Sequence, residues 1–271
     1  MSFIAVTIAG SDPSGGAGIQ ADLKTFSALG VYGASVICAL TAQNTLGVQG
    51  IHDVPADFVA LQIDSVFSDL SVDAVKIGML SQPAVIEAVA AGLDRHGMRA
   101  IVLDPVMVAA SGDVLLVPEA VAALRETLLP RASLITPNLP EAAALLGQAI
   151  AADEAEMEAQ ARALLALGAR AVLIKGGHAS GAESADLLVE PSGTRRFAAR
   201  RAATRNTHGT GCTLSSAIAA GLARGLAVHQ AVAEAKAYIT AAIGAADTLE
   251  IGAGHGPVHH FHALWRPRVE A

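Results

Sequence analysis

The chain has 271 residues, of which 52% are hydrophobic and 16% are charged, a composition that excludes a disordered protein and favours a large core with buried strands. With 18 basic and 25 acidic residues, the net charge is −7 at pH 7 and no basic stripe is present, so we expect neither nucleic acid nor a membrane as partner. Two cysteines are too few for a disulfide framework, and the apolar start lacks the features of a signal peptide, so we expect a cytoplasmic protein.

Short apolar runs alternate with amphipathic patterns along the whole chain. The runs predict strands at residues 3–9, 34–40, 74–77, 100–103, 133–135 and 171–174. The amphipathic patterns predict a first helix that ends near Gly30, followed by helices at 56–68, 83–95, 118–128, 140–146, 153–167, 210–223 and 228–246. This alternation indicates an α/β fold with a mainly parallel sheet covered on both faces, and residues 185–200 predict a small antiparallel edge. Because no linker or repeat interrupts the pattern, we expect residues 1–271 to form a single domain.

The first glycine-rich segment, residues 16–21, follows a strand and fits the G-x-G-x-x-A dinucleotide pattern. That pattern also needs an acidic residue about 20 positions later to hold a ribose, and residues 36–42 contain none. A nicotinamide or flavin site is therefore disfavoured, whereas a tight turn and a loop that closes on a small substrate both remain open. The chain also lacks the phosphate-binding motif G-x-x-x-x-G-K-[ST].

A second glycine-rich segment places Gly209, Thr210 and Gly211 directly before a predicted helix. Backbone N–H groups that converge at a helix N-terminus favour an anion, and they would stabilise charge on a migrating phosphoryl group. Cys212 lies at the same helix start, where the helix dipole is expected to lower the pKa of a thiol. The alternatives are a glycine-rich turn with a threonine cap and a cysteine that packs as a small hydrophobic residue.

Three charged residues follow the carboxyl ends of predicted strands. Asp104 follows strand 100–103, and Glu141 lies in the first turn of the helix after strand 133–135. Either could be a ligand for the Mg²⁺ that carries a nucleotide phosphate, although an acid in a first turn also suits the helix dipole. Lys175 ends strand 171–174 before two glycines and could neutralise a phosphate. Together with the segment 209–212, these residues are the set of groups that phosphoryl transfer requires.

Long strings of residues resemble the hydroxymethylpyrimidine/phosphomethylpyrimidine kinases of thiamine biosynthesis. They include AGSDPSGGAGIQADLK at 9–24, TAQNT at 41–45, KIGML at 76–80, DPVM at 104–107, TPNLPEA at 136–142, KGGH at 175–178, NTHGTGCTLS at 206–215 and GPVHHFH at 256–262. The resemblance implies a ribokinase-like three-layer α/β/α sandwich that is usually a homodimer. It also implies ATP and Mg²⁺, and two successive phosphorylations of 4-amino-5-hydroxymethyl-2-methylpyrimidine, first to the monophosphate and then to the diphosphate.

The same resemblance assigns roles to individual residues. Gln43 matches the residue that recognises the amino edge of the pyrimidine, and an amide can both donate and accept there. The positions around the substrate are matched by Gly10, Asp22, Met79 and Val106. Cys212 stands where related sugar kinases carry an aspartate base, and the glycines before it match an anion hole. Lys175 and Thr210 are expected on the nucleotide side.

Two alternatives remain open. A pyridoxal-type vitamin kinase would phosphorylate a similar hydroxymethyl group on a similar flat ring. A catalytically silent vitamin-binding protein could share the fold. The presence of Asp104, Glu141, Lys175 and Cys212 together weighs against the silent protein, since binding alone needs neither a metal nor a base.

Overall fold

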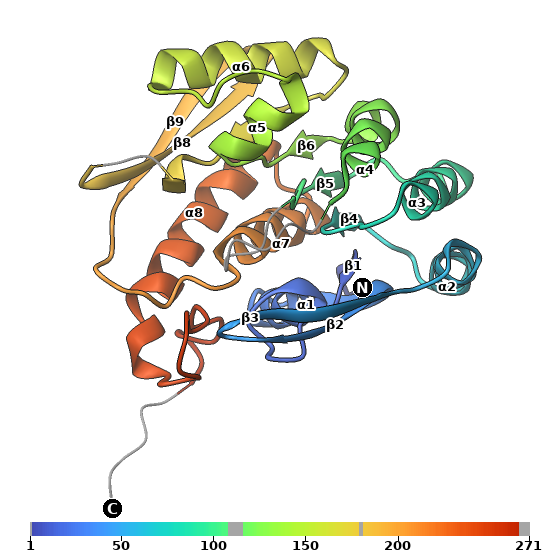
Figure 1. The fold of residues 1–271 in the computed structure, drawn as a ribbon, viewed down its shortest axis with the longest axis horizontal. Helices are drawn as coiled ribbons and strands as arrows, with labels where there is room; N and C mark the ends of the chain where they lie inside the picture. Colours follow the sequence, from blue (N-terminus) through green and yellow to red (C-terminus); the bar gives the residue numbers. More distant parts are fainter. Residues whose placement is uncertain (1, 108–115, 179–180, 266–271) are drawn as a thin grey trace, which may run out of the picture.

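A mixed β-sheet runs through the protein, which the computed structural model describes over residues 2–107, 116–178 and 181–265 (Figure 1). Within these residues nine strands pair in the order β3-β2-β1-β4-β5-β6-β7-β8-β9. Their bounds are β1 Ile4–Gly10, β2 Tyr32–Asn44, β3 Gly47–Asp53, β4 Ala74–Ile77, β5 Ile101–Leu103, β6 Leu134–Ile135, β7 Val172–Ile174, β8 Glu183–Glu190 and β9 Gly193–Arg200.

The centre of the sheet is parallel and both of its edges are antiparallel. Strands β2, β1, β4, β5, β6 and β7 pair in parallel, as the alternating sequence pattern predicts. The hairpin of β8 and β9 forms one antiparallel edge, which confirms the prediction for residues 185–200. The other edge was not predicted: β3 pairs antiparallel with β2, whose continuation to Asn44 carries Gln43 beyond the predicted strand end.

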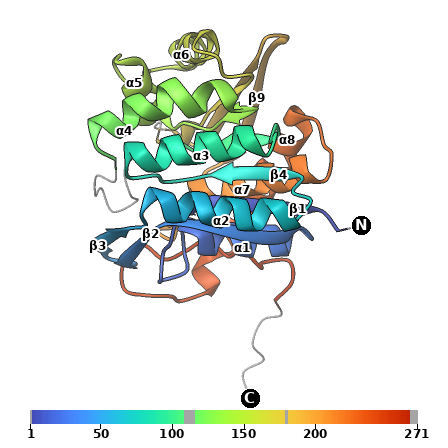
Figure 2. The same cartoon turned by 90° about the vertical axis from the view of Figure 1, so that its right-hand side faces the viewer.

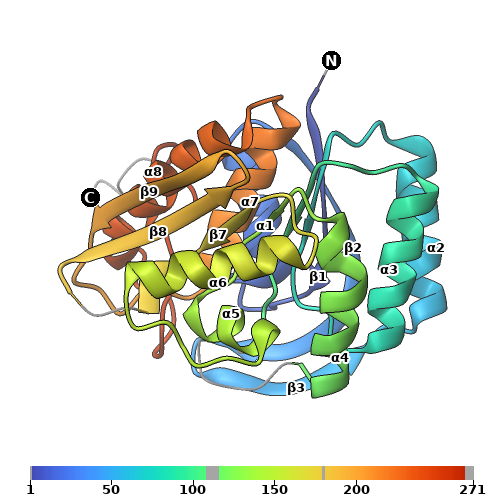
Figure 3. The ribbon, with the colours of Figure 1, turned by 90° about the horizontal axis from the view of Figure 1, so that it is seen from above.

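Helices cover both faces of this sheet (Figures 2 and 3). Their bounds are α1 Gly18–Ala28, α2 Ala56–Asp69, α3 Pro83–Arg95, α4 Pro118–Ala123, α5 Leu139–Leu146, α6 Glu154–Ala166, α7 Thr210–Ala223 and α8 Val228–Gly244. One core cluster lies between one face of the sheet and the five helices α2, α3, α4, α5 and α6. A second cluster lies between the opposite face and helices α1, α7 and α8. The protein is therefore the three-layer α/β/α sandwich that was predicted. Within the described residues, no helix has the length and apolar content needed to cross a bilayer.

Side chains of the central strands alternate between the two cores. In β1, Val6 and Ile8 pack toward α2 and α3, whereas Ala5 packs toward α1 and α7. Because successive side chains of a strand point to opposite faces, Thr7 lies on the same face as Ala5. Lys76 in β4 lies on that face for the same reason, opposite Thr7 in the parallel register. A polar pair is thus placed beneath α1 and α7.

Local signals at the helix starts explain their positions. Proline occupies the first turn of α3, α4 and α5, where its missing N–H costs no helical hydrogen bond. In α5 the Asn138 side chain accepts from the Glu141 N–H, and the Glu141 carboxylate accepts from the Asn138 N–H in return. This capping box fixes Glu141 at the carboxyl end of β6. The predicted helix 118–128 does occur, but its second half, Leu124–Leu128, is a π-helical turn.

Candidate active site

A cavity of about 880 Å³ lies beyond the carboxyl ends of the parallel strands. It is lined by residues that lie at the ends of β1, β4, β5, β6 and β7 or up to three positions beyond them, which are respectively Gly10, Met79, Asp104, Asn138 and Lys175. The predicted site residues that line it are Gly10, Gln43, Met79, Asp104, Val106, Glu141, Lys175, Gly209, Thr210, Gly211 and Cys212. Eleven positions spread over the sequence are therefore brought to one edge of the sheet, at the place where open α/β sheets bind ligands.

One end of the cavity is lined by Gly10 at the end of β1 and by Met79 after β4. A Cβ atom on Gly10 would lie 2.7 Å from Cε of Met79, so glycine is needed for these two walls to approach. Gln43 is held from one side only: its Oε1 accepts from the Thr41 hydroxyl at 3.2 Å, and its Nε2 has no partner among the described residues. This end can hold a flat ring between apolar groups and offer it an amide donor.

The glycine-rich segment before α7 forms the floor of the cavity. Gly209 has φ +77°, and a Cβ there would lie 1.8 Å from the Gly16 carbonyl oxygen, so a side chain cannot be accommodated. This contact docks the segment against the loop after β1. The first N–H groups of a helix lack intrahelical acceptors, so the N-terminus of α7 presents donors and a partial positive charge to the cavity.

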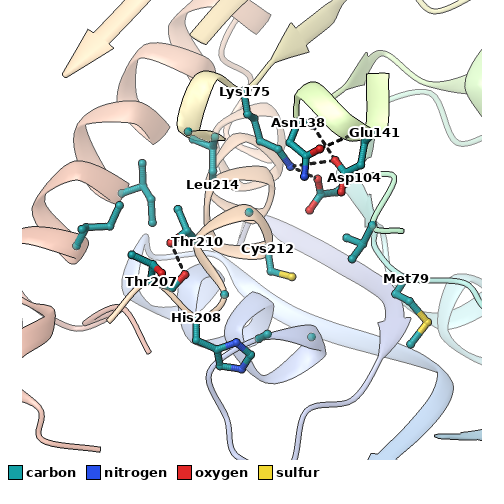
Figure 4. A pocket seen from close by; sticks show the side chains of 18 of the residues that line it. Met79, Asp104, Asn138, Glu141, Lys175, Thr207, His208, Thr210, Cys212 and Leu214 are labelled. Carbon is teal, nitrogen blue, oxygen red and sulfur yellow. Dashed lines mark hydrogen bonds and ion pairs between the residues drawn. The ribbon is translucent and has the colours of Figure 1, made fainter. Parts of the chain in front are cut away.

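At the other side of the floor, a lysine joins two buried carboxylates (Figure 4). The Lys175 ammonium donates to Asp104 Oδ1 at 2.7 Å and lies 3.8 Å from Glu141 Oε2. Asp104 also accepts from the hydroxyls of Thr136 at 2.9 Å and Ser215 at 3.2 Å. The hydrogen bond from Ser215 connects Asp104 to α7, so the position of this carboxylate is fixed relative to the glycine-rich segment at the start of that helix.

Nearby positive charge stabilises the carboxylates of Asp104 and Glu141 to different extents. Burial would raise the pKa of Asp104, but the ammonium groups of Lys175 and Lys76 hold that pKa below its ordinary value. For Glu141 burial dominates and raises the pKa to about 7, since Lys175 is more distant and Asp104 repels a second negative charge. Lys175 therefore compensates the negative charge of Glu141 less completely than that of Asp104.

The Cys212 side chain extends from the first turn of α7 into the middle of the cavity, toward the side where Met79 lies (Figure 4). The expectation that the helix dipole lowers the pKa of this thiol is wrong. Burial raises the pKa of Cys212 to about 11, and the positive charge of Lys76 opposes that shift only in part. Desolvation of a thiolate here outweighs the partial charge of a helix end.

Asp22 is the one predicted site residue that does not line the cavity. It is completely buried under α7, where it accepts from the ammonium of Lys76 at 2.8 Å and from the hydroxyls of Thr7 and Ser216, each at 2.6 Å. Both carboxylate oxygens of Asp22 thus accept hydrogen bonds within the protein, and its expected place near the substrate stays a prediction.

Sequence reasoning missed several residues around the cavity. Thr41 lies two positions before Gln43 on the same strand face, a spacing that could have identified it. Asp12 and His208 form a buried pair with 2.8 Å between Oδ2 and Nε2. Because the two residues are 196 positions apart in the sequence, no local pattern could have predicted this pair. Lys76 also lines the cavity, and a lysine inside an otherwise apolar strand was a signal that could have been followed.

Comparison with known proteins gives consistent matches. A model of the phosphomethylpyrimidine kinase family matches residues 12–259. The hydroxymethylpyrimidine/phosphomethylpyrimidine kinase of Rhizobium meliloti is 64% identical, covering 98% of this chain and 100% of the relative. A bifunctional thiamine biosynthesis protein of Geobacter sulfurreducens is 55% identical, covering 95% of this chain and 52% of the relative. The structure of an ADP complex of Bacillus subtilis pyridoxal kinase is similar with a TM-score of 0.90 and 37% identity, covering 97% of this chain and 99% of that one.

Proposed function

The chain belongs to the phosphomethylpyrimidine kinase family and is a phosphotransferase of thiamine biosynthesis that uses ATP, and we propose that its cavity carries out both phosphoryl transfers. The first transfer converts 4-amino-5-hydroxymethyl-2-methylpyrimidine to its monophosphate, and the second converts the monophosphate to the diphosphate. The proposal rests on one observation: a single cavity is lined both by Gly10, Gln43 and Met79 and by glycines, a lysine and carboxylates.

In this proposal the pyrimidine occupies the end with Gln43. The side-chain amide accepts from the exocyclic amino group through Oε1 and donates to a ring nitrogen through Nε2, which supports selection of the ring by its hydrogen-bonding edge. Met79 and Val106 pack against the faces of the ring, and Gly10 leaves space for it. The hydroxymethyl group then points toward Cys212.

The phosphates of ATP occupy the opposite end. Backbone N–H groups of Gly209 and Gly211 receive the transferred phosphoryl group, because charge that develops on it is stabilised by donors already fixed at the start of α7. The Thr210 N–H between them donates to the Thr207 carbonyl at 3.2 Å, which holds this segment in place. Lys175 neutralises the phosphates as a point charge, and burial between two carboxylates keeps its ammonium in place.

Glu141 and Asp104 fit a magnesium ion by their donor chemistry, since Mg²⁺ usually takes one or two carboxylates together with substrate phosphates. Glu141 supports this assignment because burial raises the pKa of its carboxylate to about 7, and Lys175 at 3.8 Å compensates the negative charge only in part. When bound, the ion would supply charge neutralisation for the ATP phosphates. The capping box with Asn138 keeps the Glu141 carboxylate oriented toward the cavity.

Cys212 acts as the proton acceptor for the hydroxymethyl group. In the loose transition state of phosphoryl transfer the alcohol proton leaves late, so a small fraction of a strongly basic thiolate suffices. A pKa of about 11 makes the thiolate scarce and basic at the same time. The second transfer needs no such acceptor, because a phosphate monoester is already largely ionised near neutral pH.

Product analysis tests the function as a whole. The enzyme is incubated with MgATP and either the hydroxymethylpyrimidine or pyridoxal, and the products are identified by mass. A diphosphorylated pyrimidine is the expected product. Phosphorylation of pyridoxal alone would favour the second candidate, which the similarity to the Bacillus subtilis pyridoxal kinase supports. Turnover of neither compound would favour a silent binding protein.

We further propose that residues 1–271 act as a single-domain homodimer in the cytoplasm. Three apolar side chains at the edge of the sheet are exposed: Leu40 on β2 by 47%, Leu46 in the following turn by 68% and Ile51 on β3 by 39%. Exposed apolar groups gathered on one edge suit contact with a second copy of the chain. The unpaired Cys38 and Cys212 suit a reducing compartment. Light scattering should give the mass of two chains, and a monomer at micromolar concentration would contradict the dimer.

A further inference from the structure

Lys76 is a completely buried lysine in the centre of the sheet, at a position to which the proposed chemistry gives no role. Lysine is almost never fully buried unless it is paired, because removing an ammonium from water costs several kcal/mol. Its partner is Asp22 in α1, at 2.8 Å, and this carboxylate is equally buried. Such a pair calls for an explanation, since apolar residues of similar volume often stabilise a core as well or better.

The surroundings of the pair fix the position of the ammonium. Thr7 lies opposite Lys76 in the sheet and donates its hydroxyl to the Asp22 oxygen that also accepts from Lys76. Ser216 of α7 donates to the other oxygen. A Cβ on Gly78 would lie 2.7 Å from Nζ of Lys76, so the ammonium packs closely against the backbone just before Met79.

The same network reaches the face of α7 that carries Cys212. Cys212 and Ser216 are four residues apart, so they lie one above the other on one face of the helix. Gly211 and Ser215 are related in the same way, and Ser215 donates to Asp104. The first two turns of α7 therefore contact two separate buried pairs, Lys76–Asp22 under Cys212 and Lys175–Asp104 under Gly211.

The charges that face the Cys212 thiol come from four elements. Lys76 from β4 and Lys175 after β7 favour a thiolate, whereas Asp22 from α1 and Asp104 after β5 oppose it. Lys76 has the largest favourable effect on the thiol, and that effect is larger than the opposing effect of Asp22. Exchanging the Lys76–Asp22 pair for a neutral pair should therefore make the thiolate harder to form.

We propose that Lys76 is a positioning residue of the first phosphoryl transfer: oriented by Asp22, its ammonium supplies the positive charge that stabilises Cys212 as a thiolate, while Lys175 serves the transferred phosphoryl group. This inference rests on the proposed role of Cys212 as proton acceptor. In the step itself, the thiolate takes the hydroxyl proton and becomes a thiol, and the substrate oxygen forms a bond to the γ-phosphorus. The bond between that phosphorus and the oxygen of the ADP leaving group breaks, and Lys76 keeps its proton throughout.

The test compares three forms of the enzyme, all with Cys38→Ala so that Cys212 is the only thiol. Lys76→Met paired with Asp22→Asn removes both charges at once, so no unpaired buried charge threatens folding. Lys76→Arg keeps the positive charge and serves as the conservative variant. Thermal denaturation establishes that each variant is folded.

Two quantities are measured. The first is the pH dependence of iodoacetamide alkylation at Cys212 in the ligand-free enzyme, because only the thiolate reacts. The second is the ratio of the first to the second phosphorylation rate. For the doubly neutral variant we expect the alkylation profile to move to higher pH and the ratio to fall in proportion to the lost thiolate, tenfold for each pH unit of that shift. Lys76→Arg should keep both values near those of the parent.

Failure of this inference can be told apart from failure of the proposed function. If Cys212→Ala lowers both transfers equally, Cys212 is not the proton acceptor and the proposed function of that residue fails. If Cys212→Ala lowers the first transfer selectively, but the doubly neutral variant leaves the alkylation profile and the ratio unchanged, only the role of Lys76 is overturned.

Discussion

The first phosphorylation should become much faster between pH 7 and pH 9, and the second should not. With a pKa of about 11 for Cys212, the thiolate makes up about 1 part in 10⁴ at pH 7 and about 1 part in 10² at pH 9. The sign follows from the raised pKa: the thiol form, which cannot accept a proton, predominates at neutral pH, and the active form grows as pH rises toward 11. The first transfer should therefore increase about 100-fold over this range, without a plateau.

The second transfer is a control within the same enzyme. Its nucleophile is a phosphate monoester whose second pKa is about 6, so its ionisation changes little above pH 7. In the proposed mechanism both transfers use the same ATP site and the same Glu141, so titration of either affects both rates and cancels in their ratio. Initial rates would be measured at saturating MgATP, starting in one case from the hydroxymethyl compound and in the other from its monophosphate.

Substitutions of Cys212 sharpen the measurement. Cys212→Ala should lose about 10²–10⁴-fold of the first transfer, lose far less of the second, and show no pH slope. Cys212→Asp should restore part of the first transfer with a nearly flat profile, because a carboxylate is already ionised at pH 7. A constant ratio of the two rates from pH 7 to 9 in the unmodified enzyme would refute the reasoning, and a nearly active alanine variant would make Cys212 a packing residue.

Three further substitutions test the remaining assignments. Gln43→Leu should weaken pyrimidine binding by about 1–3 kcal/mol while nucleotide binding, measured by calorimetry, stays intact, and an unchanged pyrimidine affinity would exclude the assignment. Glu141→Gln keeps an oxygen that can accept from the Asn138 N–H, so the helix start should persist while the Mg²⁺ concentration for half-maximal rate rises; a deficit that does not respond to Mg²⁺ would make Glu141 a capping residue only. Lys175→Ala should lower nucleotide use or turnover with pyrimidine affinity nearly unchanged, and because it leaves Asp104 without its ion-pair partner it should also lower the melting temperature. Loss of pyrimidine affinity alone would contradict that role.

Much of the fold could be predicted because its signals are local. The bounds of α3, β4 and α7 agree with those expected from apolar periodicity and from proline and glycine at the element ends. Strand β3 was missed because most of its residues are exposed and two are glycines, so no apolar pattern marks it. Its pairing with β2 determines where Gln43 lies, and that pairing is a tertiary interaction.

The sequence by itself determined which residue types follow the strand ends, and this was sufficient to predict phosphoryl transfer. The anion site before α7 and the roles of Asp104, Glu141 and Lys175 stay predictions. The tertiary structure alone decided the ionisation of Cys212 and the place of Asp22. A helix start is visible in the sequence and favours a thiolate, but the desolvation that opposes it comes from segments far apart in the chain. The Asp22–Lys76 pair likewise joins residues 54 positions apart. Charge stabilisation depends on which groups surround a side chain in space, and only the folded chain brings these groups together.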